Sequence, residues 1–248
     1  MGDICKEGKA SQDKCTETQC EEDRECLTSS SHQARCVPVV SKGGHGCLSP
    51  PFLSHAKSQI ISKFAVYTCH SDFKFVGASQ MSTCDSSGSW AGLNGSCERV
   101  AFYNVNKFPF RSQIPGTVRD GWKVEFLGIP INISSMLVSL KYRKLYTALQ
   151  IAVRFATDNQ VESMSVNAST GNRLKDKPRI LQREFPFKLG KPFNLTLQLH
   201  QHRIDVYVDQ QLLLAWMHRL FISAIHEVLV QDEGFYHSIK YSNNYFRP

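Results

Sequence analysis

The second half of the chain is dominated by short segments in which apolar and polar residues alternate. In residues 148–155 every second residue, beginning at Leu149, is large and apolar. The residues between them are Gln150, Ala152 and Arg154. Because residues two apart share one face of a β-strand, this segment is predicted to be a strand with one buried face.

The same alternation recurs further along, in residues 193–199 and 204–208, with a predicted hairpin connection between the two segments. Residues 220–230 are the one candidate for an amphipathic helix. Repeated short strands without cysteine favour an all-β fold class, in which an antiparallel β-sandwich is held together by its own core. We expect Trp122 and Trp216 to lie in that core.

Charge and hydropathy exclude two classes of partner. The formal net charge of +7 is uneven, because residues 1–100 carry ten Lys or Arg against eleven Asp or Glu, and residues 101–248 carry nineteen against eleven. This excess is mild, and no zinc-finger spacing or phosphate-binding loop accompanies it, so we expect no nucleic-acid partner. The longest apolar run, residues 212–217, is far shorter than the roughly 18–20 residues that cross a bilayer, so we expect no membrane insertion.

Cysteine usage indicates an extracellular protein. All nine cysteines lie between Cys5 and Cys97, and without any C-x-x-C pair they are typical of a disulfide framework. Four N-x-[ST] sequons agree with secretion, and their predicted glycosylation sites are Asn94, Asn132, Asn167 and Asn194. No apolar leader follows Met1, so we expect that the chain begins near a processed start.

The first forty residues contain an odd number of cysteines: Cys5, Cys15, Cys20, Cys26 and Cys36. One of them must pair with another chain, pair with a cysteine outside this sequence, or stay free, and the first case predicts a disulfide-linked dimer. Few apolar residues lie between them, so we expect cross-links to stabilise this segment. Residues 1–40 loosely resemble cysteine-rich modules of the EB or EGF-like kind, and residues 41–46 are predicted to be a linker.

A sharper pattern covers residues 47–97. The segments Tyr67-Thr-Cys69-His-Ser-Asp-Phe73 and Cys84-Asp-Ser-Ser-Gly88-Ser-Trp90 make it resemble a sushi (complement control protein) module. The resemblance implies the disulfides Cys47–Cys84 and Cys69–Cys97, a buried Trp90, and a role as a spacer or protein-binding unit. Ser96 stands where the family usually has a proline. Residues 98–107 are predicted to be a second linker.

Residues 108–248 resemble a galectin carbohydrate-recognition domain. The similarity is carried by Phe108-Pro-Phe, Gly121-Trp-Lys-Val-Glu-Phe-Leu-Gly128, Phe185-Pro-Phe187-Lys-Leu-Gly190, Ile204-Asp-Val-Tyr-Val-Asp209 and Trp216-Met-His218-Arg219. It implies a galectin-like jelly roll, with the sugar bound on the concave face of one sheet.

The resemblance also implies which residues line that face. Galectins use a His-x-Asn-Pro-Arg strand, and Gln150, Ala152 and Arg154 occupy its three sugar-contacting positions. The next strand's Asn is matched by Asn167. The family's Trp-Gly-x-Glu-x-Arg segment falls within residues 174–179, which contain neither that Trp nor that Glu. These departures predict an altered, non-standard galactoside specificity.

Positive charge follows the same strands in the sequence, at Arg173, Lys175, Lys177 and Arg179. One interpretation is a groove for a sulfated or acidic polysaccharide, a sialylated glycan or an acidic protein. The other is a solvated basic loop without a ligand.

Two functional hypotheses follow. The first is a secreted recognition or adhesion protein that binds an extracellular glycan or glycoconjugate through Gln150, Arg154, Asn167 and the basic segment. The alternative is an interaction module that has lost sugar binding and engages a receptor or matrix protein through the sushi and galectin-like domains. No metal motif, nucleophile elbow or paired catalytic carboxylates are present, so we expect neither enzymatic activity nor a cofactor.

Overall fold

The computed structural model describes residues 24–28, 34–38, 47–131, 134–143, 146–156, 161–170, 173–174, 179–180, 185–231 and 234–243. Only backbone is considered for residues 24–28, 34–38, 170, 173–174 and 179–180. Every regular element in these ranges is a β-strand except one short 3-10 helix, so the predicted all-β class is confirmed. Among these elements no helix has both the length and the apolar character that a bilayer crossing requires.

The chain forms two compact units, each built from several stretches of sequence. The first contains Met1–Leu53, Lys57–Thr68 and Ala78–Asn94, and the second contains Ser54–Ala56, Cys69–Gly77 and Gly95–Pro248. The predicted 47–97 module therefore contributes residues to both units. Several predicted features lie outside the described residues: Cys5, Cys15, Cys20, the 41–46 linker, Asn132, Lys175 and Lys177.

Short sheets make up the cysteine-rich part of the chain. The strands β1 (Arg24–Thr28) and β2 (Ala34–Pro38) pair antiparallel, with Cys26 opposite Cys36 in the backbone register. A four-stranded sheet has the order β3-β4-β6-β7, and β5 pairs with β8. The bounds of these strands are β3 (Ala56–Ile61), β4 (Phe64–Cys69), β5 (Phe73–Ser79), β6 (Met81–Cys84), β7 (Trp90–Ala91) and β8 (Asn94–Arg99).

Two disulfides cross-link these short strands. Cys47 is bonded to Cys84 and Cys69 to Cys97, which is the pairing that the sushi resemblance implies. The expectation that Trp90 is buried is met only in part. Its ring is only partly buried, and its indole N–H donates to the carbonyl of Leu48 at 2.7 Å. A sheet this small cannot cover a side chain as large as tryptophan on every side.

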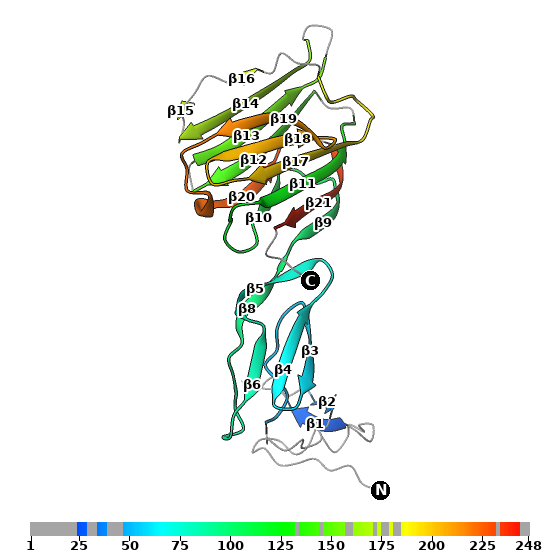
Figure 1. Cartoon of the computed structure of the whole chain (residues 1–248). Coiled ribbons are helices and arrows are strands. Elements are labelled where there is room, and N and C mark those ends of the chain that lie inside the picture. The colour runs from blue at the N-terminus through cyan, green and yellow to red at the C-terminus, as the bar shows by residue number, and fades with distance from the viewer. Residues whose placement is uncertain are drawn as a thin grey trace. The chain divides into compact units, whose positions relative to one another are not determined.

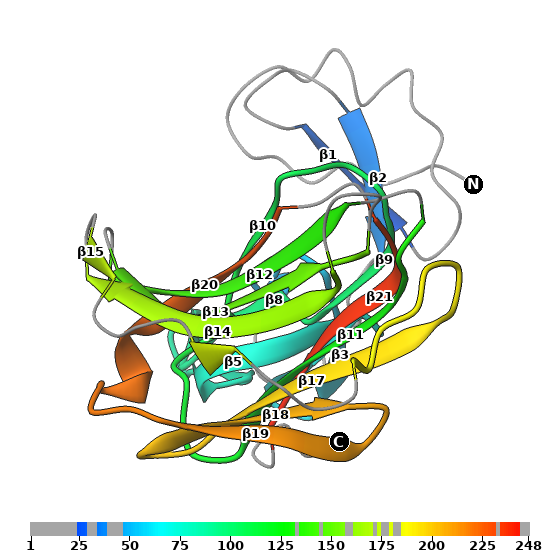
Figure 2. The same ribbon diagram turned by 90° about the horizontal axis from the view of Figure 1, so that it is seen from above.

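The second half of the chain forms the predicted antiparallel β-sandwich, whose two sheets lie face to face in Figures 1 and 2. One sheet has the order β10-β20-β12-β13-β14-β15, with β16 also paired to β14. Its strands are β10 (Phe110–Gln113), β12 (Ser135–Tyr142), β13 (Tyr146–Arg154), β14 (Ser163–Thr170), β15 (Arg173–Leu174), β16 (Arg179–Ile180) and β20 (Ile225–Val230).

The other sheet has the order β19-β18-β17-β11-β21-β9. Its strands are β9 (Ala101–Val105), β11 (Trp122–Ile129), β17 (Phe193–Leu199), β18 (Arg203–Val208), β19 (Gln211–Met217) and β21 (Phe235–Ser242). In Figure 2 the first sheet is bent, with its hollow side turned away from this second sheet. We call that hollow side the outer face.

An apolar core fills the space between the two sheets. Trp122 and Phe126 of β11 are fully buried, and Trp216 of β19 is 9% exposed, which confirms the expected core position of both tryptophans. Aromatic rings continue the core, with Phe193 5.3 Å from Phe187 and 6.1 Å from Tyr236 between ring centres. Burial of this apolar surface is the main force that holds the two sheets together.

Residues 220–230, the one candidate for a helix in a sequence without a convincing helical pattern, are mostly not helical. Only Ile222–Ala224 form a 3-10 helix (η1), and Ile225–Val230 form β20 in the middle of a sheet. This strand pairs with β10 on one side and β12 on the other. Its β-branched residues suit a pleated sheet, and pairing on both edges outweighs a weak helical pattern.

A buried carboxylate holds the hairpin between β17 and β18. Asp205 is 3% exposed and accepts hydrogen bonds from Nε of Arg203 at 3.0 and 3.1 Å. Nε2 of His200 lies 3.3 Å from the same carboxylate. The N–H of His200 also donates to the carbonyl of Arg203, which closes the predicted hairpin.

Substituting Asp205 with alanine is expected to destabilise the protein by roughly 2–3 kcal/mol, because Arg203 and His200 lose their shared acceptor. The free energy of unfolding from denaturant titration measures the effect. The matched control is the exposed Glu162→Ala, which should change that free energy by less than about 0.5 kcal/mol. Equal effects of the two substitutions would contradict this role for Asp205.

Candidate functional site

The alternation of β13 places three of the predicted site positions on the outer face. Leu149, Ile151 and Val153 are at most 1% exposed and belong to the core between the sheets. Gln150 and Ala152 are partly buried and Arg154 is exposed, as expected for the opposite face of the same strand. The sequence-based division of this strand into two faces is therefore confirmed.

Strand pairing assembles the outer face into cross-strand rows of three residues. One row contains Ser139, Gln150 and Asn167, and the next contains Leu137, Ala152 and Ser165. The third row contains Ser135, Arg154 and Ser163. Small side chains therefore surround Arg154 and leave space above the sheet for a ligand.

Asn167 is a buried polar residue of this surface, as is Ser139 in the same row. Its side chain is 7% exposed, and its Oδ1 atom has no hydrogen-bond partner among the residues that the structure describes. On the neighbouring strand, Nε2 of Gln150 donates to Oγ of Ser139 at 3.4 Å. A buried carbonyl oxygen without a donor is costly, so Oδ1 of Asn167 is an acceptor whose hydrogen bond is still to be made.

Arg154 is the exposed cation of the same face. Within the described part of the chain its guanidinium group has no carboxylate partner. The expected basic segment follows β14 and adds two short pairings, with Arg173 opposite Thr170 and Arg179 opposite Val166 in the backbone register. Arg154 is therefore available to a ligand's oxygen atoms.

Polar side chains continue along the outer face toward β10. Nη1 of Arg111 lies 3.0 Å from Oε1 of Glu227, and Nε2 of Gln113 donates to Oε2 of Glu227 at 3.4 Å. Nζ of Lys141 donates to Oγ1 of Thr147 at 3.2 Å. Burial and the charge of Arg111 lower the pKa of Lys141, and Glu227 partly opposes them. The sequence analysis assigned no role to these residues, because their proximity depends on pairing between strands distant in the sequence.

The predicted glycosylation sites differ in exposure. Asn94 is exposed in β8, Asn194 is partly buried in β17, and Asn167 is buried. The backbone N–H of Asn194 donates to the carboxylate of Asp209 at 2.8 Å, and the side-chain oxygen of Asn194 accepts from the hydroxyl of Thr196 at 3.3 Å. Asn94 is thus the most accessible of these three side chains.

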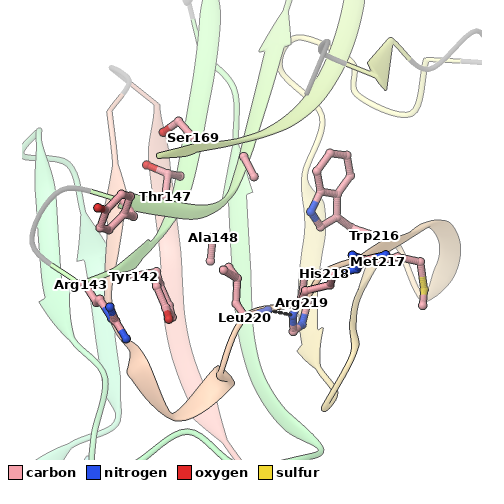
Figure 3. A pocket seen from close by; sticks show the side chains of 12 residues that line it. Tyr142, Arg143, Thr147, Ala148, Ser169, Trp216, Met217, His218, Arg219 and Leu220 are labelled. Atoms are coloured by element: carbon pink, nitrogen blue, oxygen red, sulfur yellow. Dashed lines mark hydrogen bonds between the residues drawn. The ribbon is translucent and has the colours of Figure 1, made fainter. Parts of the chain in front are cut away.

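The structure contains a pocket of about 770 Å³ that the sequence analysis did not anticipate. We call it the end pocket, because the ends of β12, β13 and β14 line it on one side and residues 216–220 on the other (Figure 3). These segments approach one another only through the packing of the two sheets. The residues Trp216-Met-His218-Arg219 were noticed in the sequence as part of a resemblance and not as a site.

His218 is the titratable group in the wall of the end pocket. Its Nδ1 atom accepts a hydrogen bond from the N–H of Leu220 at 3.2 Å, which is drawn in Figure 3. Burial is the main cause that lowers the pKa of His218, and the charge of His202 adds to it. Carbonyl groups of His200 and Arg203 partly oppose this shift.

The lowered pKa of His218 predicts a loss of stability in acid. The unfolded chain, in which the pKa of this histidine is 6.5, binds the proton more tightly than the folded chain does. As the pH falls toward and below 6.5, the unfolded chain therefore carries more of this proton. The stability contributed by the neutral ring is therefore complete above that pH and declines as the pH falls. The variant His218→Asn retains an acceptor for the N–H of Leu220. Its melting temperature should fall less than that of the wild type when the pH is lowered from about 7 to about 5. The exposed His237→Asn is the control, and an identical pH dependence of wild type and His218→Asn would contradict the prediction.

Metal binding has no support in the described ranges, since no three His, Cys, Asp or Glu side chains there gather into a possible metal site.

Comparisons with known proteins agree with this architecture. Residues 109–240 match the family model for galactoside-binding lectins. The crystal structure of the galectin LEC-6 from Caenorhabditis elegans shares the fold at 17% identity, with a TM-score of 0.51, over 58% of this chain and 96% of that chain. A human galectin-16 variant has 18% identity and a TM-score of 0.49 over 58% of this chain and 100% of that chain.

No curated protein matches the sequence. The family model nevertheless covers more than half of the chain and spans both sheets of the sandwich. The chain belongs to the galactoside-binding lectin family.

Proposed function

We propose that this chain is a secreted recognition protein whose galectin-like domain binds a glycan on the outer face of β13 and β14. The observation that supports this most directly is the buried Oδ1 atom of Asn167, which lacks a donor beside Gln150. The unpaired guanidinium group of Arg154 lies further along the same strand and face.

The chemistry of these groups suits a polyhydroxylated ligand. An unsatisfied buried acceptor costs about 1–3 kcal/mol, and a sugar hydroxyl that donates to Asn167 would recover this free energy on binding. The guanidinium group of Arg154 donates to hydroxyl, ring or carboxylate oxygens in a fixed planar geometry. The face therefore offers both an acceptor and several donors.

The same face departs from the family pattern in ways that change specificity. Gln150 and Ala152 stand at positions where the resemblance places His and Asn, and Ala152 has no side chain that can form a hydrogen bond. Residues 135–141, 147–154 and 163–169 contain no aromatic ring against which a sugar could stack. Recognition through these strands then depends on hydrogen bonds, and we propose a specificity different from that for standard galactosides.

Positive charge extends the proposed site along the sequence. Arg173, Lys175, Lys177 and Arg179 follow the strand that contains Asn167. We propose that they attract sulfated, sialylated or otherwise acidic glycans, with a contribution that salt screens.

The cysteine-rich first part of the chain supports an extracellular location. Two disulfides cross-link the short sheets, and such bonds persist in oxidising compartments. We propose that the EB/EGF-like and sushi-like segments present the lectin domain to its ligand. The odd cysteine among residues 1–40 would add avidity by linking two chains. Lectins bind sugars without transforming them, which is consistent with the expectation that the chain is not an enzyme.

A second candidate function is protein binding without sugar recognition. It is favoured by large apolar side chains that are exposed in the first unit, namely Leu48 at 79% and Phe52 at 90%. Exposed apolar groups of this size are common at protein-binding surfaces. The partner in this case is an extracellular receptor or a matrix protein.

A glycan array probed with the full chain, at low and at physiological salt, tests the first proposal. We expect binding to defined glycans that resists salt and weakens roughly tenfold or more in Arg154→Ala, because a charge-assisted hydrogen bond is lost. Asn167→Ala should weaken binding of the same glycans without destabilising the fold, since it removes an unsatisfied buried oxygen.

Two controls make the array decisive. Ser169→Ala removes the 167–169 sequon but keeps Asn167, so it should retain binding of uncharged glycans on the outer face. Lys188→Ala removes an exposed charge from the loop before β17 and should retain binding too. Absence of binding to every glycan, together with a glycan attached to Asn167 by mass spectrometry, would overturn the proposal and favour protein recognition.

A further inference from the structure

The end pocket exists because small side chains lie near the ends of β13 and β14, opposite the large side chains of Trp216 and Met217 in β19. Ala148, Ala168 and Ser169 lie at the ends of β13 and β14, and the pairing of β12 with β13 contains a register shift at Leu140 and Lys141. Two packed sheets lie about 10 Å apart, so three small residues leave a gap between them. The resulting cavity of about 770 Å³ falls in the range of small-ligand sites.

Aromatic rings form much of the wall of this cavity. Tyr142 and Tyr146 lie on one side, with ring centres 6.3 Å apart, and Trp216 lies on the other. Figure 3 shows Trp216 across the cavity from the end of β13. Flat apolar rings of this kind stack against the C–H faces of sugar rings and also against other planar or apolar groups.

The charge of the lining has one sign. Arg143 and Arg219 line the cavity, and among the residues that the structure describes no Asp or Glu does. In the described part of the molecule neither guanidinium group has a carboxylate partner, and Arg143 lies 5.3 Å from the centre of the Tyr142 ring. The backbone N–H of Arg143 donates to the carbonyl of Ala224 at 3.3 Å, which fixes the residue at the rim. Uncompensated guanidinium groups favour an anionic ligand.

Hydroxyl groups of the residues that line the pocket favour a sugar over an acid with an aliphatic tail. Besides Oγ1 of Thr147, which accepts from Nζ of Lys141, the hydroxyls of Ser169, Tyr142 and Tyr146 belong to lining residues. An aliphatic tail would leave such groups without hydrogen-bond partners, whereas a sugar can donate to them and accept from them. Aromatic walls, two cations and several hydroxyls therefore fit a ligand that combines a negative charge with a ring of hydroxyls.

We propose that the end pocket binds an anionic sugar residue, a hexose that carries a carboxylate or a sulfate group. Arg143 and Arg219 bind the anion, and the rings of Trp216 and the two tyrosines contact the sugar. This site lies at the ends of β12, β13 and β14 and contains none of Gln150, Arg154 and Asn167. It therefore acts independently of the proposed outer-face site.

The test uses the full chain labelled with ¹⁵N and three matched sugars: glucuronate, glucose 6-sulfate and glucose. The chain has three tryptophans, so the indole N–H signal of Trp216 can be assigned from the spectrum of Trp216→Phe. We expect this signal to shift in a saturable manner with at least one of the two anionic sugars and not with glucose. A shift with glucuronate alone identifies a carboxylate site, and one with glucose 6-sulfate alone identifies a sulfate site.

Variants separate the end pocket from the outer face. Arg219→Gln should weaken binding of the anionic sugar roughly tenfold, and Arg143→Gln similarly, because each loses a charge-assisted contact. Lys188→Gln and Arg154→Ala should bind the anionic sugar in the end pocket with the affinity of the wild type, as followed by the Trp216 signal. The proposal is overturned if neither anionic sugar shifts the Trp216 signal saturably, or if Lys188→Gln weakens binding as much as Arg219→Gln. Loss of binding in Arg154→Ala would also overturn it, by placing the ligand on the outer face.

Discussion

Burial of alternate side chains between two sheets is the constraint on which the rest of the domain depends. Leu149, Ile151 and Val153 of β13 are excluded from water by the opposing sheet, and their burial leaves Gln150, Ala152 and Arg154 on the outer face. A shift of one residue in the register would exchange the two sets and expose the core. The position of the proposed glycan site is thus a consequence of how the core is packed.

The two proposed sites of this domain differ in how they are built. The outer face is made of short side chains in cross-strand rows, so it is shallow and its specificity depends on hydrogen bonds. The end pocket is formed where two sheets fail to fill the space between them, so it has aromatic walls, with two exposed arginines in its lining.

The cysteine-rich part is stabilised in a different way from the sandwich. Strand β3 buries little of its surface, since five of its six residues are exposed. The disulfides Cys47–Cys84 and Cys69–Cys97 restrict the unfolded chain and compensate for a small core. The lectin domain needs no such cross-links, because Trp122, Phe126 and their neighbours supply enough buried apolar surface.

The sequence by itself determined the features that depend on local spacing. Alternation in residues 148–155 and 193–199 identified strands and their faces, and the cysteine pattern of residues 47–97 led to the observed pairing through a family resemblance. Tertiary structure decided the rest. Residues 225–230 became a central strand because two neighbours pair with them, and Asn167 became a buried, unsatisfied acceptor because the surrounding strands cover it. The end pocket joins residues 142–148 to residues 216–220, which no local pattern relates, since a cavity depends on the shapes of side chains that meet only when the two sheets pack.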